Sequence, residues 1–129
     1  MMKILLDTHL LLWAASGAKQ LSNAARTLIE EPFSEIFFSA ASLWEIVIKQ
    51  SLERDDFQVD SRILRRELLD NGYIELPITS EHTLAVSDLP LIHKDPFDRI
   101  LIAQSKVEGI LLLTSDLIVA QYSGSIRLV

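Results

Sequence analysis

Two spacings of hydrophobic residues alternate along the chain. Short unbroken apolar runs, "KILL" at 3–6, "IFF" at 36–38 and "ILLLT" at 110–114, are separated by longer segments with scattered apolar residues. Unbroken runs are typical of strands that are covered on both faces, and apolar residues three or four positions apart are typical of helices. The alternation predicts an α/β fold with a mostly parallel sheet of four to five strands.

Capping and stop signals place the ends of these elements. Ser22 precedes a helix that Pro32 ends, and Asp95 followed by Pro96 begins a helix that Gly109 ends. The expected strands lie at 3–7, 34–40, 73–79, 109–116 and 125–129. The expected helices lie at 8–17, 23–31, 42–53, 62–71, 80–89 and 96–109, and the fourth of them is capped by Asp60 or Ser61. We also expect a helical turn at 117–122 and a polar turn around Asp55 and Asp56.

Length and composition narrow the class of protein. A chain of 129 residues with 49% hydrophobic content predicts a single domain over residues 1–129 with a core of its own. The absence of cysteine suits a reducing compartment, and we therefore expect a cytoplasmic protein. Asp7 and His9 interrupt the apolar N-terminal segment too early for a signal sequence or a membrane span of about 18 residues.

The net charge limits the function further. With 12 Lys and Arg against 18 Asp and Glu, the chain carries a formal charge of −6. This sign argues against a module that holds DNA by bulk electrostatics. It is compatible with an enzyme whose acids bind metal ions, because the ions reverse the charge that a phosphate meets.

Four acids stand where the ends of parallel strands would bring them together. Asp7 and Asp116 each end a predicted strand, Glu45 lies about two turns into the segment after the second strand, and Asp98 begins the helix before the fourth. Ligand sites of open α/β sheets lie outside the carboxyl ends of the strands. We therefore expect these four acids to converge at one edge of the sheet.

Three of these acids also have a purely structural interpretation. Asp7 and Asp116 stand where the N-cap of a following helix would be. Glu45 completes a capping box with Ser42 and precedes Lys49 by four residues, the favourable order for a helical ion pair. Taken one at a time, these acids need no further function.

Asp98 is harder to explain in this way. It lies one helical turn from Leu101 and Ile102. A favourable helix dipole contributes only about 0.3–1 kcal/mol, whereas burying an uncompensated carboxylate costs several kcal/mol. A cation among the acids would remove this cost, and carboxylate oxygens without cysteine favour Mg²⁺ or Mn²⁺. The leading chemistry is therefore metal-assisted phosphodiester hydrolysis.

The segments that carry these acids resemble a known family. "LLDTH", "SAASLWEIVIK", "HKDPFDRILIAQ" and "LLLTSD" are similar, in this order, to segments of the PIN-domain family, in particular the VapC-type ribonuclease toxins of VapBC toxin–antitoxin pairs. The similarity runs from Met2 to Val129. It implies a three-layer α/β/α fold, Mg²⁺- or Mn²⁺-dependent endoribonuclease activity on RNA, a cognate antitoxin partner and a homodimer, with no membrane attachment.

The resemblance also assigns residues by position. It places the metal ligands and catalytic acids at Asp7, Glu45, Asp98 and Asp116, and an accessory hydroxyl at Thr114 or Ser115. His9 departs from the family, in which many relatives have Ser or Asn, and we expect it to pack or cap locally. We interpret Trp13 and Trp44 as core or interface anchors.

Basic residues beside the acids are further candidates. His93, Lys94 and Arg99 border the expected site and could hold phosphate. Arg62, Arg65 and Arg66 could meet RNA or an acidic partner, although a solvated helix face is the simpler interpretation.

Two other functions fit the same residues. The first is a PIN-like binding module without catalysis, which would not bind Mg²⁺ or Mn²⁺. The second is a metal-dependent phosphatase on another α/β fold, which would hydrolyse small phosphate esters instead of RNA.

Overall fold

The computed structural model describes residues 2–52 and 59–129, so the turn expected around Asp55 and Asp56 lies outside the described residues. Its centre is one five-stranded sheet in the order β3-β2-β1-β4-β5, in which every neighbouring pair is parallel. The predicted α/β class is confirmed, including the fifth strand. The strands are β1 Lys3–Leu6, β2 Glu35–Ser39, β3 Ile74–Leu76, β4 Leu111–Thr114 and β5 Ile126–Leu128.

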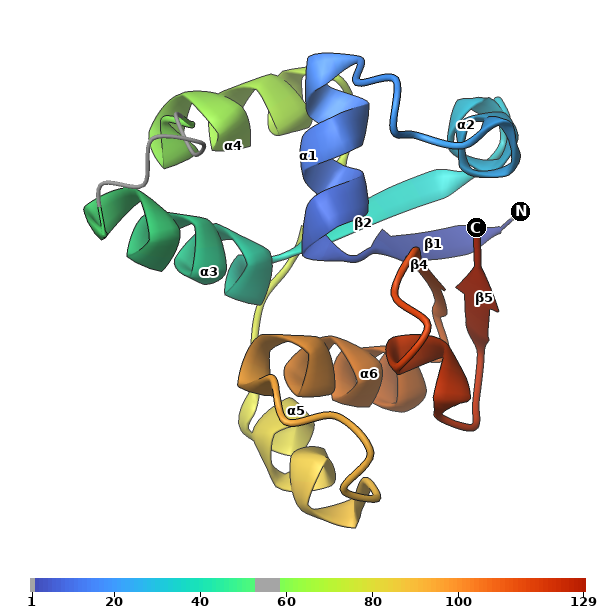
Figure 1. The fold of residues 1–129 in the computed structure, drawn as a ribbon. Coiled ribbons are helices and arrows are strands. Elements are labelled where there is room, and N and C mark those ends of the chain that lie inside the picture. The colour runs from blue at the N-terminus through green and yellow to red at the C-terminus, as the bar shows by residue number, and fades with distance from the viewer. Residues whose placement is uncertain (1, 53–58) are drawn as a thin grey trace.

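Helices cover both faces of the sheet and make a three-layer fold. Figure 1 shows α1 and α4 on one side of the strands and α5 and α6 on the other. None of the helices in residues 2–52 and 59–129 has the length and apolar character needed to cross a membrane. The α-helices are α1 Thr8–Ser16, α2 Asn23–Glu30, α3 Ala40–Ser51, α4 Ser61–Asp70, α5 Ser80–Ala85 and α6 Pro96–Glu108, and the 3₁₀ turns are η1 Val86–Asp88 and η2 Val119–Gln121.

Several expected caps are present. Asp7, Ser22, Asp60 and Asp95 each accept a backbone N–H with the side chain at the start of α1, α2, α4 and α6. Gly109 ends α6 with a φ of 68°, a left-handed conformation that glycine adopts without a steric penalty.

The capping box expected for Ser42 and Glu45 is wrong. Ser39 caps α3 and accepts the Ala41 N–H at 3.0 Å, because β2 runs into the helix directly and leaves Ser39 in an extended conformation. Ser42 lies inside the helix, buried, and its hydroxyl accepts a hydrogen bond from the Thr8 hydroxyl at 2.9 Å. The predicted Glu45–Lys49 ion pair is present, with 3.1 Å between Oε2 and Nζ.

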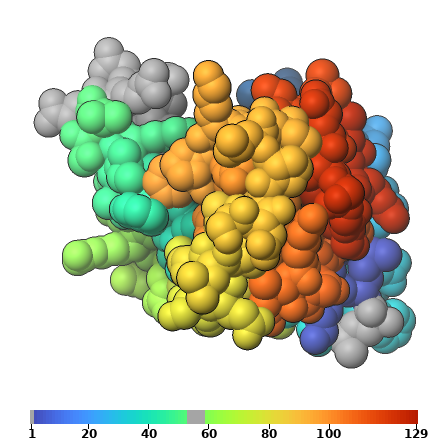
Figure 2. Space-filling view, turned by 90° about the horizontal axis from the view of Figure 1, so that it is seen from below, coloured from blue at the N-terminus to red at the C-terminus, as the bar shows by residue number. Residues whose placement is uncertain are grey.

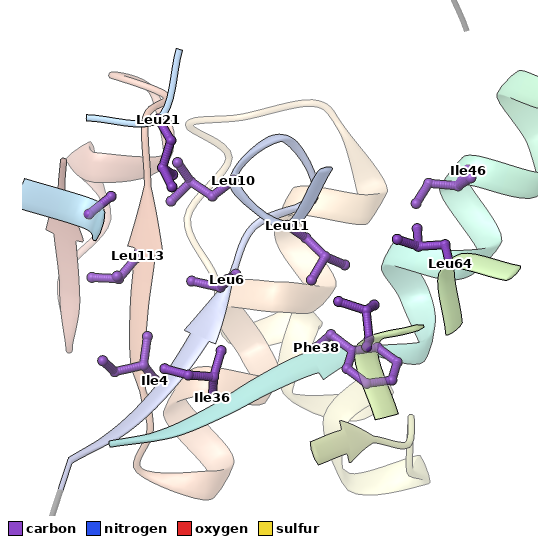
Figure 3. Close-up of a cluster of buried hydrophobic side chains, with 12 residues drawn as sticks. Ile4, Leu6, Leu10, Leu11, Leu21, Ile36, Phe38, Ile46, Leu64 and Leu113 are labelled. Atoms are coloured by element: carbon purple, nitrogen blue, oxygen red, sulfur yellow. The ribbon is translucent and has the colours of Figure 1, made fainter. Parts of the chain in front are cut away.

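Alternate residues of the central strands fill two separate hydrophobic clusters. Ile4 and Leu6 of β1 and Leu113 of β4 pack with residues of α1 to α4, as Figure 3 shows. Leu5 and Leu112 point to the other face and pack with α6. Burial on both faces explains why the strands are unbroken apolar runs in the sequence.

The first cluster generates a stability prediction. Leu113→Ala should lower the free energy of unfolding by about 2–5 kcal/mol, because it leaves a cavity beside a fully buried strand. Leu117→Ala is the matched control: that side chain is 70% exposed, and its loss should change stability by no more than about 0.5 kcal/mol. Urea denaturation measures both, and equal effects would contradict the position of Leu113 in the core.

Candidate functional site

Asp7 and Thr114 join the ends of the two central strands. Asp7 follows β1 and is only 4% exposed. The Thr114 hydroxyl, at the end of β4, donates to Asp7 Oδ2 at 2.6 Å, while Asp7 Oδ1 accepts the Leu10 N–H at 2.9 Å. Of the two hydroxyls expected near the last acid, the structure thus places that of Thr114 on Asp7. Asp7 is an N-cap, as its structural interpretation proposes, and also the most buried of the four acids.

Asp116 is connected to the same group of residues. Its backbone N–H donates to the Thr114 hydroxyl oxygen at 3.0 Å, and its Oδ1 accepts the Ile118 N–H at 2.7 Å. Burial tends to raise the pKa of Asp116, but the hydrogen bonds from Ile118, His93 and Val119 outweigh it and lower the pKa. Asp116 is therefore stabilised as a carboxylate.

Asp98 behaves in the opposite way. Burial raises its pKa most strongly, the negative charges of Asp95, Glu45 and Asp7 raise it further, and His93 opposes them; the pKa reaches about 7. This electrostatic effect of Glu45 and Asp7 on Asp98 indicates that acids from α3, from the end of β1 and from α6 lie near one another. Burial also raises the pKa of Asp7, although hydrogen bonds from Thr114 and Leu10 oppose it.

His93 connects Asp98 to Asp116. Its Nε2 lies 3.0 Å from Asp98 Oδ2 and 3.2 Å from Asp116 Oδ2. The sequence predicts His93 beside the site as a possible phosphate contact and does not indicate this link between two acids. The link brings together the start of α6 and the end of β4, and no spacing in the sequence could have indicated it.

The donor atoms fit a hard divalent cation. Asp7, Glu45, Asp98 and Asp116 offer carboxylate oxygens, the ligands that Mg²⁺ and Mn²⁺ prefer. Among the described residues, the donor atoms of His93, Asp98 and Asp116 lie within 4.8 Å of one another, and Asp7 and Glu45 lie outside this group. The raised pKa of Asp98 and of Asp7 shows that the fold places these groups where negative charge is unfavourable. A cation at this edge would relieve that cost, and the arrangement is suited to positioning a phosphodiester beside it.

Arg99 forms hydrogen bonds with other groups of the protein. Its guanidinium donates to the carbonyl oxygens of Pro90 and Val86 at 2.9 and 3.1 Å and to the Tyr122 hydroxyl at 3.1 Å. The Tyr122 hydroxyl also accepts the His93 N–H at 2.8 Å. Arg99 thus supports the segment that carries His93, and a direct contact with phosphate stays a prediction.

The remaining candidates are the aromatic residues with His9, and the arginine cluster. His9 contacts the Trp13 ring, with 5.9 Å between ring centroids, and Trp13 packs against the core as expected. Trp44 is 59% exposed and lies edge-on to Phe97 at 5.1 Å, so it is not a core residue. In the arginine cluster, Arg65 forms an exposed ion pair with Glu75, and Arg62, Arg65 and Arg66 line a pocket of about 310 Å³.

Known proteins share this fold. A family model for the PIN domain matches residues 4–124. A comparison with curated protein sequences finds no match. Similar solved structures include the VapBC2 complex of Rickettsia felis bound to a DNA fragment from its promoter, with 13% identity, a TM-score of 0.70 and 98% of both chains covered.

Two further solved structures are similar. A toxin–antitoxin complex from Klebsiella pneumoniae has 17% identity and a TM-score of 0.62, with 96% of this chain and 95% of that chain covered. VapC20 of Mycobacterium tuberculosis, described as a sarcin-ricin loop cleaving toxin, has 18% identity and a TM-score of 0.61, with 93% of this chain and 96% of that chain covered. Identities this low show that the fold is shared.

The pKa of Asp98 predicts how stability depends on pH. In metal-free protein, the unfolded carboxyl ionises near 3.8 but the folded one near 7, so ionisation favours unfolding and stability falls as the pH rises through this window. Asp98→Asn removes the effect. Its melting temperature in a chelator should equal or exceed that of the parent, with the largest difference at pH 8 and a smaller one at pH 5.

Asp116→Asn is the matched control for this experiment. The pKa of Asp116 is lowered, so its carboxylate contributes stability above pH 4 that the variant lacks. Asp116→Asn should therefore melt below the parent at pH 8. If Asp98→Asn also melts below the parent there, Asp98 is a favourable helix-start residue and the crowding of acids is not real.

Proposed function

This chain belongs to the PIN-domain family, and on that premise we propose that it is an Mg²⁺- or Mn²⁺-dependent endoribonuclease, the toxin of a VapBC-type toxin–antitoxin pair. We take residues 1–129 to form one such domain. The observation that carries the proposal is the group of His93, Asp98 and Asp116, whose donor atoms lie within 4.8 Å of one another, together with the raised pKa of Asp98, to which Glu45 and Asp7 contribute. A metal-dependent nuclease needs such a cluster of acids, whereas a binding module does not.

Each acid has a role in this proposal. Asp7, Glu45 and Asp98 hold the metal, and Asp116 completes the site or holds a second ion. When bound, a divalent ion polarises a water molecule and the phosphodiester, so no side-chain nucleophile is needed. Thr114 fixes Asp7 Oδ2 through its 2.6 Å hydrogen bond and thereby orients the most buried of these carboxylates.

Two alternatives make different predictions. A PIN-like binding module keeps the fold without the chemistry, but all four acids are intact in this chain. A metal-dependent phosphatase would hydrolyse small phosphate esters at the same carboxylates. The related structure described as a sarcin-ricin loop cleaving toxin favours RNA as the substrate.

A cognate antitoxin is the proposed protein partner. Two of the similar structures are described as a VapBC complex and a toxin–antitoxin complex. We propose that a segment of the antitoxin occupies the acidic cleft of this chain and so blocks access of RNA. We also propose that the protein acts in the cytoplasm, together with its substrate.

A homodimer is the second proposed assembly. The face where α3 meets the start of α6 exposes Trp44, which is 59% exposed and lies edge-on to Phe97. Leu84 of α5 and Leu91 in the loop after η1 are also exposed, at 72% and 91%. A pocket of about 420 Å³ lies on this face and is lined by Trp44, Ile78 and Phe97 among others. Figure 2 looks onto α5 and the loop after it, in yellow and light orange, beside α3 in green. Apolar side chains gathered in this way are typical of a surface that another protein covers.

The proposed chemistry predicts which variants lose activity. The parent should cleave RNA only with Mg²⁺ or Mn²⁺, and Asp7→Asn, Glu45→Gln and Asp98→Asn should each reduce the rate by orders of magnitude. Asp88→Asn, at an exposed aspartate in η1, is the matched control and should cleave like the parent. A cleavage assay that includes a phosphate monoester separates the alternatives: turnover of the ester alone supports the phosphatase, and no turnover with no metal binding supports the module.

The dimer proposal has its own experiment. The parent should sediment as a dimer at micromolar concentration, and Trp44→Asp should shift it to a monomer because it places a charge in the apolar pocket of the shared face. Phe33→Asp is the control, since Phe33 is 77% exposed in the loop before β2, away from that face. A monomeric parent, or equal effects of the two variants, would contradict the proposed interface.

A further inference from the structure

Both nitrogens of the His93 ring are engaged. Nδ1 accepts the backbone N–H of Asp95 at 3.1 Å, and Nε2 lies 3.0 Å from Asp98 Oδ2 and 3.2 Å from Asp116 Oδ2. A nitrogen that accepts a hydrogen bond carries no proton, so the neutral ring has its proton on Nε2. His93 is therefore a hydrogen-bond donor to Asp116, its Nε2 also lies close to Asp98, and its ring is half-buried between the two carboxylates.

This tautomer decides between two roles for His93. Nε2, Asp98 and Asp116 present atoms within 4.8 Å of one another, a spacing that suits three metal ligands. Ligation by Nε2, however, requires a lone pair on that nitrogen and a proton on Nδ1. A proton on Nδ1 would point at the Asp95 N–H, which donates to the same atom. In this arrangement His93 donates a hydrogen bond to Asp116 and does not bind a metal.

His93 also forms a hydrogen bond with the oxygen of Asp116 that a metal ion would use, Oδ2. Asp116 Oδ1 already accepts the Ile118 N–H at 2.7 Å and the Val119 N–H at 3.4 Å. Oδ2 is the oxygen left on Asp116, and Nε2 of His93 is directed at it. The His93 backbone is held in place by its own N–H, which donates to the Tyr122 hydroxyl at 2.8 Å.

We propose that His93 is an internal competitor of the metal ion. In the metal-free protein its Nε2–H donates to Asp116 and lies against Asp98, and so partly offsets their negative charge. Binding of a metal ion by these carboxylates would break the hydrogen bond to Asp116 and displace the ring. His93 is thus a positioning residue that keeps the two carboxylates together until the ion replaces it, an inference that rests on the proposed metal-dependent function.

The Mn²⁺ affinity of His93 variants tests the proposal. His93→Ala removes the competing donor and should bind Mn²⁺ about tenfold more tightly than the parent, the size expected for losing a hydrogen bond to a charged group. His93→Gln keeps an N–H donor of similar reach and should stay within about threefold of the parent. Electron paramagnetic resonance of free Mn²⁺ gives each affinity, and melting curves establish that each variant is folded.

Two spectroscopic readouts do not depend on activity. Long-range ¹H–¹⁵N correlation spectra of the metal-free protein should show the proton of His93 on Nε2, and Mg²⁺ should shift both ring nitrogens as the ring leaves the carboxylates. Mn²⁺-loaded parent should show no spin-echo modulation from a bound imidazole nitrogen. Such modulation, or Mn²⁺ binding to His93→Ala that is equal to or weaker than binding to the parent, would overturn the proposal.

The same titrations separate this proposal from the proposed function. If the parent binds Mn²⁺ and cleaves RNA but His93→Ala does not bind the ion more tightly, only the competition is wrong. If neither the parent nor His93→Ala binds Mn²⁺, both the metal-dependent function and the competition are wrong. If His93→Ala binds Mn²⁺ and the parent shows no measurable binding, the competition between His93 and the ion is supported.

Discussion

The site depends on one constraint, the burial of carboxylates at the edge where the parallel strands β1 and β4 end. Asp7 is almost inaccessible there, and its Oδ2 is held by the Thr114 hydroxyl from the neighbouring strand. Taking a carboxylate out of water costs several kcal/mol unless a partner compensates it. A neutral hydroxyl compensates only in part, and the remaining cost is visible as the raised pKa of Asp7. The structure therefore holds a charge that it does not fully neutralise.

Much of this arrangement can be predicted from the sequence because its causes are local or topological. Apolar runs covered on both faces predict the parallel strands, and caps such as Ser22 and Asp95 predict where helices begin. Parallel topology then brings the residues after each strand to one edge, so Asp7 and Asp116 could be expected near each other.

The parts that could not be predicted depend on contacts between elements distant in the sequence. The start of α3 at Ser39 is one, because Ser39 both caps the helix and donates to Gln104 of α6 at 2.6 Å. The position of His93 between Asp98 and Asp116 is another. The exposure of Trp44 is a third, since an aromatic residue in an apolar helix has no local feature that indicates which side faces solvent.

These distant contacts explain why the acids cannot relieve their repulsion by moving apart. The buried Ser39–Gln104 hydrogen bond joins α3, which carries Glu45, to α6, which carries Asp98. The Thr114 hydroxyl likewise joins β4 to Asp7. Lys49 already pairs with Glu45 at 3.1 Å. With the backbone elements held in this way, the other acids can be relieved by a proton on Asp98, by a donor such as the Nε2–H of His93, or by a cation. The fold itself therefore favours the binding of positive charge at this site.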